Sequence, residues 1–176
     1  MTRGLPGDER LLFWAHRQAY ASSLRGRLHV LEAAVPYGGC ALVYCLLGLL
    51  ALRDATRRAA LSAMAAGVIA WLLSDALKVL VERPRPCLNR FACGGNSFPE
   101  GPGMVLAAVA VATWPSSRPI AAIAALCALA DAAVQLGYGN HWPSDLVGAW
   151  LIGGLCGFAV PRIAARLAPS EAPLGE

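Results

Sequence analysis

The stretch Pro119–Leu167, PIAAIAALCALADAAVQLGYGNHWPSDLVGAWLIGGLCGFAVPRIAARL, decides the fold, because two long apolar runs flank a short polar break. The runs cover residues 119–138 and 144–167. At about 1.5 Å per residue, each helix would reach roughly 30 Å or more, the thickness of a bilayer core. Residues 137–140 interrupt the helix between them. The stretch therefore predicts two transmembrane helices joined by a short polar turn.

The whole chain shares this apolar character. Of its 176 residues, 57% are hydrophobic and 15% are charged, and the mean hydropathy is +0.52. This composition is too apolar for a soluble domain of this size. We expect further spans at Leu31–Leu52, at Ala59–Val81 and, if residues 101–103 join its helix, at Met104–Trp114. The sequence thus predicts an all-α, polytopic transmembrane helical bundle of about five spans. The last span carries small residues that permit close helix packing, namely Gly148, Gly153, Gly154 and Gly157.

The N-terminal region contains no spanning segment. Between residues 8 and 28, apolar and basic side chains are mixed as in an amphipathic helix that lies at a membrane surface. The apolar members are Leu11, Leu12, Trp14, Ala15 and Ala19, and the basic members are Arg10, Arg17, Arg25 and Arg27. We therefore divide the chain into an N-terminal interfacial helix (1–30), a transmembrane domain (31–167) and a disordered tail (168–176).

Charge and cysteine usage exclude several classes of function. The net charge of +4 is modest, and no basic patch is interleaved with aromatic residues, so we do not expect nucleic-acid binding. Cys87 and Cys93 bracket a polar loop and would form a disulfide if that loop faces an oxidising compartment. No second pair completes a zinc-site spacing, so no metal or other cofactor is expected. Four cysteines lie in apolar runs and are typical of small core residues, namely Cys40, Cys45, Cys127 and Cys156.

The polar break before the last span holds the strongest candidates for chemistry. His141 and Asp145 are four residues apart, so a helix beginning at Pro143 places them on one face. A carboxylate near an imidazole fixes its tautomer and stabilises the charge that it gains in a reaction. The alternative is that His141 caps a helix or packs at the membrane interface.

A second group of polar residues lies at the end of the second span. Asp75 and Lys78 are three residues apart, and ionisable groups inside a span are either functional or paired with each other. The segment 83–86, Arg-Pro-Arg-Pro, cannot continue the helix. It opens a loop that reaches residue 103, and we expect Glu82 and Arg83 on the surface of this loop.

Three segments at the ends of predicted spans share the order and spacing of a known set of motifs. Residues Lys78–Pro86 match K-x6-R-P. Residues 97–102 stand where that set has P-S-G-H, and residues 134–145 stand where it has S-R-x5-H-x3-D. On these residues the chain resembles the type 2 phosphatidic acid phosphatase superfamily, which includes the lipid phosphate phosphatases. The resemblance covers roughly residues 59–167.

The resemblance implies roles for four matching residues. Lys78 and Arg85 would bind the oxygens of a phosphate and neutralise its charge. His141 would attack phosphorus and become a phosphohistidine, which water hydrolyses, and Asp145 would orient the imidazole. In the family the site lies near the membrane surface, where a lipid headgroup enters while its chains stay in the bilayer.

Four positions depart from the family pattern. Pro102 replaces the histidine that protonates the leaving oxygen, and Glu100 replaces the serine of the same motif. Gln135 replaces an arginine that binds phosphate, and Val134 replaces the serine before it. Loss of a general acid typically costs about 10²- to 10⁴-fold in rate. Glu100 is the candidate substitute acid, and Gln135 remains a candidate phosphate contact.

Three interpretations stay open at this point. The protein is a phosphatase of a lipid phosphate or prenyl diphosphate with a rearranged acid. Alternatively, it is a catalytically impaired member that binds a lipid phosphate or a partner protein in the membrane. In the third interpretation, it performs a different transfer on a lipid-linked phosphate.

The distribution of arginines bears on orientation. With five spans, six arginines fall on the face opposite the site, and the positive-inside rule makes that face cytoplasmic: Arg53, Arg57, Arg58, Arg118, Arg162 and Arg166. The basic N-terminal helix argues for the opposite orientation. We expect an integral protein of a bacterial inner membrane with its site facing the periplasm or exterior, in contact with bilayer lipid and, as a further possibility, with a second copy or a membrane partner.

Overall fold

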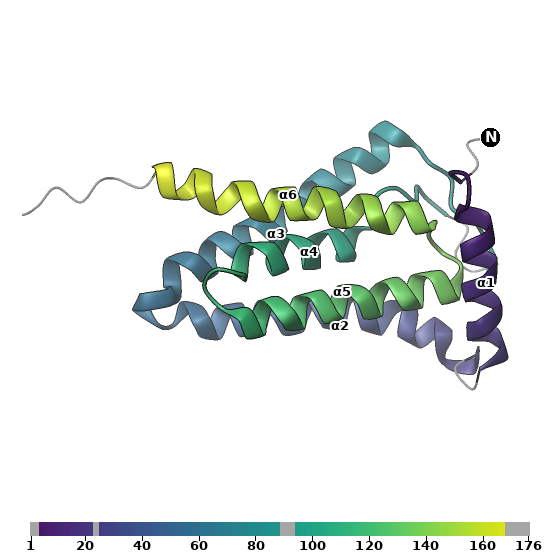
Figure 1. Ribbon diagram of the computed structural model, residues 1–176, viewed down its shortest axis with the longest axis horizontal. Coiled ribbons are helices and arrows are strands. Elements are labelled where there is room, and N and C mark those ends of the chain that lie inside the picture. Colours follow the sequence, from purple (N-terminus) through teal and green to yellow (C-terminus); the bar gives the residue numbers. More distant parts are fainter. Residues whose placement is uncertain (1–3, 23–24, 89–93, 168–176) are drawn as a thin grey trace, which may run out of the picture.

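The computed structural model describes residues 4–22, 25–88 and 94–167 and consists of helices (Figure 1). Their connections are short except for the long one between residues 81 and 101. The predicted tail 168–176 lies outside the described residues. The helices are α1 (Asp8–Ala21), the 3-10 turn η1 (Arg25–Arg27), α2 (Leu28–Ala51), α3 (Asp54–Val81), α4 (Gly101–Thr113), α5 (Arg118–Tyr138) and α6 (Pro143–Leu167).

Four of these helices, α2, α3, α5 and α6, are long and apolar enough to cross a membrane. The prediction of an all-α membrane bundle is therefore confirmed. The fifth predicted span is α4, which does include residues 101–103 but has only 13 residues. At about 1.5 Å per residue it reaches roughly 20 Å, less than the bilayer core.

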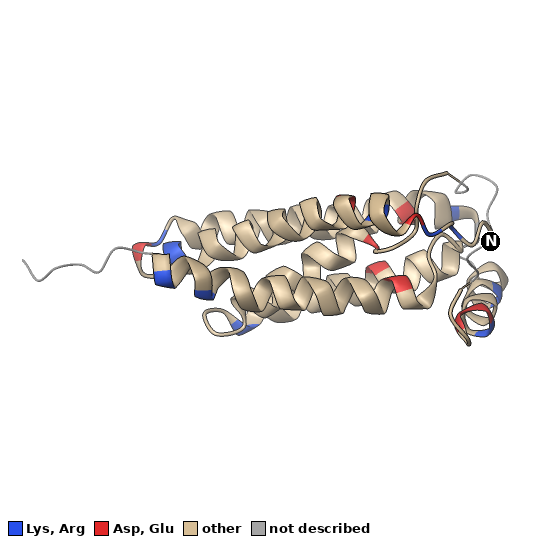
Figure 2. Ribbon diagram, turned by 90° about the horizontal axis from the view of Figure 1, so that it is seen from above, with Lys and Arg blue, Asp and Glu red and all other residues tan. Residues whose placement is uncertain are grey.

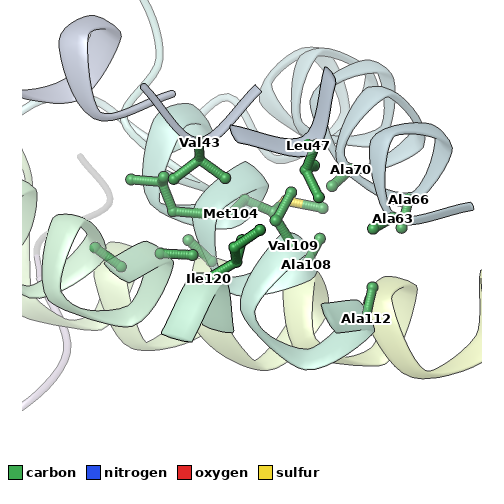
Figure 3. Close-up of a cluster of buried hydrophobic side chains, with 14 residues drawn as sticks. Val43, Leu47, Ala63, Ala66, Ala70, Met104, Ala108, Val109, Ala112 and Ile120 are labelled. Atoms are coloured by element: carbon green, nitrogen blue, oxygen red, sulfur yellow. The ribbon is translucent and has the colours of Figure 1, made fainter. Parts of the chain in front are cut away.

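Helix α4 forms the centre of the bundle, packed by α3, α5, α6 and α2. Ten of its 13 residues are buried, because its sequence GPGMVLAAVAVAT is apolar on every side. Figure 3 shows Met104, Ala108 and Val109 of α4 among side chains of the neighbouring helices. Helix α3 contributes small residues and α2 larger ones to this cluster, namely Ala63, Ala66, Ala70, Val43 and Leu47.

Helix α6 approaches α4 closely through two glycines. A Cβ atom at Gly153 would collide with the backbone oxygen of Met104, and one at Gly157 would collide with that of Ala108. The small residues predicted to permit close packing therefore do so at these two positions. The contact fixes the start of α6, and with it the polar turn, relative to the start of α4.

Helix α1 lies across one end of the bundle, where it packs against α5 and α6 (Figure 1). Leu12 of α1 is fully buried. Its outer side exposes Leu11, Phe13 and Trp14, and apolar side chains at the end of a membrane bundle suit the headgroup region. This arrangement fits the predicted interfacial position.

Candidate functional site

Three connections converge at the end of the bundle that α1 covers: the segment after α3, the segment before α4, and the turn between α5 and α6 (Figure 1). Helix α3 ends because Glu82 adopts a left-handed conformation, with φ of 48°. The Asn96 side chain donates to the Lys78 backbone oxygen at 2.8 Å, which caps the helix. Asn96 also pairs with Pro84 in an isolated β-bridge. The arginines at 83 and 85 are thereby held at the bundle end.

A small polar pocket of about 140 Å³ opens between these segments. Its lining includes five of the six predicted site residues, namely Lys78, Arg85, Glu100, Gln135 and His141, together with Pro102 and Asn140. Helices α2 and α3 add Glu32, Pro36, Tyr37 and Trp71. The pocket is smaller than the roughly 300–1,000 Å³ of sites for drug-sized ligands, and its volume suits a group such as a phosphoryl headgroup.

The His141 ring is buried, with Arg85 at one ring nitrogen and Asp145 near the other. Arg85 Nη1 lies 2.8 Å from Nε2, and because a guanidinium only donates, Nε2 must carry the lone pair. The proton is then on Nδ1, which lies 3.6 Å from Asp145 Oδ2. Burial lowers the pKa of His141, against the opposing effect of Asp145. The structure thus holds a neutral imidazole that lines the pocket, with its lone pair on Nε2 beside Arg85.

Asp145 is fully buried and is itself held by an arginine. Arg83 Nη1 donates to Asp145 Oδ1 at 2.6 Å, and the Trp142 backbone N–H donates to Oδ2 at 2.9 Å. The expectation that Arg83 lies on the loop surface was therefore wrong: the residue is 9% exposed. The first arginine of the Arg-Pro-Arg-Pro segment fixes Asp145, and the second, Arg85, faces the pocket.

Helix α1 completes this cluster. Asp8, at its first position, accepts from Arg83 Nη2 at 2.8 Å and from the Ser144 hydroxyl at 2.5 Å. Asp8 also accepts from the backbone N–H groups of Ser144 and Leu5. Burial raises the pKa of Asp8, but these hydrogen bonds lower it by more, so the carboxylate is ionised. We name Asp8, Arg83, Ser144 and Asp145 the anchor cluster.

The two predicted phosphate-binding cations are available to an anion. Among the described residues, Lys78 forms one ion pair, with the exposed Asp75 at 3.8 Å. Arg85 donates to His141 and to both oxygens of Asn140, at 2.7 Å and 3.2 Å, and has no carboxylate within 4.0 Å among the described residues. Arg85 is not neutralised at close range, and the pairing of Lys78 with the exposed Asp75 is long and screened by solvent, so both cations can bind a phosphate.

Asn140 connects the remaining pocket residues. Its side-chain amide donates to Glu32 Oε1 at 3.1 Å and to Gln135 Oε1 at 3.3 Å, while its own Oδ1 receives Arg85. Gln135 in turn donates to Asp131 Oδ1 at 3.3 Å. Gln135 lines the pocket as predicted, but both ends of its amide have protein partners. In the structure, Gln135 orients Asn140, and Asn140 in turn holds Arg85.

Glu100 lies at the start of α4 with its side chain 1% exposed. It caps the helix by accepting from the Gly103 N–H at 2.5 Å. The absence of a Cβ at Gly103 lets Glu100 and Asp131 face each other, since a methyl group there would collide with Glu100 and lie 3.3 Å from Asp131 Oδ2. Burial, and then the facing Asp131, raise the pKa of Glu100 well above its ordinary value. The surroundings of this pocket-lining carboxyl group therefore favour its protonated form.

Sequence reasoning missed four residues of the site: Asp8, Glu32, Arg83 and Asn140. The position of Asn140 beside His141 was a usable signal, because polar residues in a short turn next to a reactive histidine share its surroundings. Glu32 lies in a region read as apolar span. Among the described residues, no group of three or more His, Cys, Asp or Glu side chains is arranged to hold a metal ion. The predicted Cys87–Cys93 disulfide remains a prediction, because Cys93 lies outside the described residues.

Comparison with known proteins identifies the fold. No protein-family model and no curated protein sequence matches this chain. Among solved structures, it is similar to the crystal structure of the first transmembrane PAP2 type phosphatidylglycerolphosphate phosphatase from Bacillus subtilis. The match covers 93% of this chain and 87% of that chain, with a TM-score of 0.69 and 19% sequence identity. The chain therefore has the fold of a PAP2-type membrane phosphatase, and it is an integral membrane protein.

Proposed function

We propose that the protein removes the terminal phosphate from a membrane lipid phosphate or a prenyl diphosphate, with His141 as nucleophile. The observation that carries this proposal is the convergence of Lys78, Arg85 and His141 on one small pocket. Lys78 and Arg85 are more than 50 positions from His141 in the sequence, and a packing role alone does not require two cations beside a neutral imidazole. The PAP2-type fold supports the same reaction class.

The proposed reaction has two steps. The lone pair of His141 Nε2 attacks phosphorus, the bond to the leaving oxygen breaks, and that oxygen takes the proton of Glu100. Arg85 turns from Nε2 to the phosphoryl oxygens, where it and Lys78 stabilise the transition state. Water then attacks the phosphohistidine and gives a proton to the Glu100 carboxylate, which restores the imidazole and releases phosphate. Asp145 stabilises the positive charge of the ring through Nδ1.

An apolar groove beside the pocket supports a lipid substrate. This groove has a volume of about 240 Å³ and lies between α2, α3 and α4. Trp71 lines both the groove and the polar pocket. The other residues of the groove are Cys40, Tyr44, Gly67, Val68, Leu72 and Val105. A lipid with its phosphate at His141 would place a hydrocarbon chain against these side chains.

The distribution of arginines supports a site that faces away from the cytoplasm. The six arginines at the opposite end of the bundle fit the positive-inside rule if that end is cytoplasmic. For a bacterial inner membrane the pocket would then open toward the periplasm.

The proposal is tested by measuring phosphate release from lipid phosphates and prenyl diphosphates by the purified protein, next to Lys78→Ala and Arg85→Ala. We expect release by the wild-type protein and a loss of about 10²-fold or more in kcat/KM for each variant. If no lipid is hydrolysed, but a lipid phosphate binds saturably and both substitutions abolish the binding, the protein is a binding module. If phosphate appears on another lipid instead of in solution, it is a transferase.

The Glu100→Gln variant tests the substitute acid. The amide preserves the shape and the helix cap but has no proton to donate, so we expect kcat on an alkyl phosphate to fall by about 10²- to 10⁴-fold. Burial and the facing Asp131 raise the pKa of Glu100, which favours the protonated acid that the proposed step needs. Wild-type kcat should therefore decline as pH rises through that pKa, and the variant should lose this decline. On p-nitrophenyl phosphate, whose leaving group needs no proton, the two proteins should differ by less than about tenfold. An equal loss on both substrates makes Glu100 a structural residue.

A further inference from the structure

A larger groove lies at the end of the bundle opposite His141, where α4 ends, α5 begins and α6 approaches its C-terminus (Figure 1). Its volume is about 450 Å³. Small apolar side chains, including Ala110, Ala122 and Ala125, form its floor. It contains no histidine, carboxylate or other nucleophile, so it is suited to binding and not to catalysis.

Two aromatic side chains form the walls of this groove, and the guanidinium group of an arginine is stacked on each ring. Arg118 lies over the Trp114 ring at 4.2 Å from its centroid, and Arg162 lies over the Phe158 ring at 3.5 Å. Such stacking holds the long arginine side chains against apolar surface while the charge stays at the rim. Among the described residues neither guanidinium forms an ion pair. The rim thus presents two uncompensated positive charges.

The surroundings of the groove are also basic. The turn between α2 and α3 and the end of α6 bring Arg53, Arg57, Arg58 and Arg166 to the same end of the bundle. Figure 2 shows these basic positions together at that end. Within the described residues, Asp54 is the only carboxylate there. Any lipid headgroup at this level of the membrane therefore meets a strongly positive surface.

We propose that this groove is a binding site for an anionic phospholipid of the adjacent leaflet. One acyl chain lies on the alanines between Trp114 and Phe158, and the headgroup phosphate is bound by Arg118 and Arg162. Basic pockets between transmembrane helices bind anionic headgroups in this way. A zwitterionic lipid offers the same phosphate, but its ammonium group would lie among the arginines and be repelled. The site therefore selects phosphatidylglycerol or cardiolipin over phosphatidylcholine.

The test uses the full-length protein, delipidated and placed in phosphatidylcholine nanodiscs, with phosphatidylglycerol titrated in and the retained lipid counted by native mass spectrometry. We expect saturable binding of phosphatidylglycerol to the wild-type protein. The double variant Arg118→Gln/Arg162→Gln should weaken it by about tenfold or more. Ala122→Trp should do the same, because it fills the groove and keeps both charges. Ala122 is exposed, so the larger side chain does not enter the core.

The matched control is Arg57→Gln/Arg58→Gln, which removes two exposed charges at the same end without touching the groove. This control should bind within about twofold of wild type. An equal loss of phosphatidylglycerol binding in both double variants would mean a diffuse electrostatic effect and would overturn the proposed site. Retention of phosphatidylcholine equal to that of phosphatidylglycerol would overturn it as well. A mass showing a second copy of the chain, displaced by Ala122→Trp, would assign the groove to a dimer instead. The readout does not use phosphatase activity, so it stands apart from the function proposed for His141.

Discussion

The His141→Ala variant is expected to release phosphate at least about 10³-fold more slowly than the wild-type protein, because no other side chain in the pocket offers a lone pair at the same place. Nε2 of the neutral ring lies beside Arg85, and Nδ1 lies 3.6 Å from Asp145 of the anchor cluster. The measurement is single-turnover phosphate release from a radiolabelled lipid phosphate. The wild-type protein should in addition retain label in an acid-labile bond, and the variant should retain none.

The control for this substitution is His29→Ala, which removes an exposed histidine at the start of α2. It should keep wild-type turnover and labelling. Binding of inorganic phosphate to His141→Ala, through Lys78 and Arg85, shows that the pocket is still formed. Turnover that survives the loss of His141 at more than about a tenth of the wild-type rate would remove it as the nucleophile.

The Arg83→Met variant is expected to have the largest effect on stability. The substitution leaves the carboxylates of Asp8 and Asp145 buried without their shared cation, and breaking a buried ion pair from one side costs about 3–5 kcal/mol. We expect a clear fall in Tm in detergent. We also expect kcat to fall, because Asp145 is no longer held against His141. Thermal unfolding followed by circular dichroism and the turnover assay measure the two effects.

Two further variants separate the anchor cluster from a general loss of charge. Arg10→Met removes an exposed arginine from α1 and should leave Tm nearly unchanged. Adding Asp8→Asn to Arg83→Met should cost less than the sum of the two single changes, because the second substitution removes a charge that the first left unpaired. Additive effects would show that Asp8 and Arg83 do not act on each other.

The helical bundle was predictable because each long helix is marked by a continuous apolar run in the sequence. Long apolar runs fix four helices by length alone, whereas α4 was predicted as a fifth span and is instead a short helix buried within the bundle. The length of the apolar runs did not predict that α4 lies at the centre of the bundle. That position depends on contacts of its backbone with Gly153 and Gly157. Those contacts involve residues about 50 positions apart in sequence, and the spacing of apolar residues along the chain does not predict them.

The site was predictable where its residues follow a fixed spacing and not elsewhere. His141 and Asp145 are one helical turn apart, and Lys78 and Arg85 stand at the two ends of one motif. Arg83 was misjudged because a charged residue between a helix end and a proline is usually solvated. Its partner Asp8 is 75 positions away. Only the folded chain brings the two together.

The anchor cluster joins α1 to α6. Asp8 precedes Ser144 by 136 positions in the chain, so it leaves the ribosome well before α6 does. Until α6 has entered the bilayer, Arg83 lacks Asp145 and Asp8 lacks Ser144 as a partner. The anchor cluster, and with it the placement of Asp145 beside His141, is therefore completed only when α6 inserts.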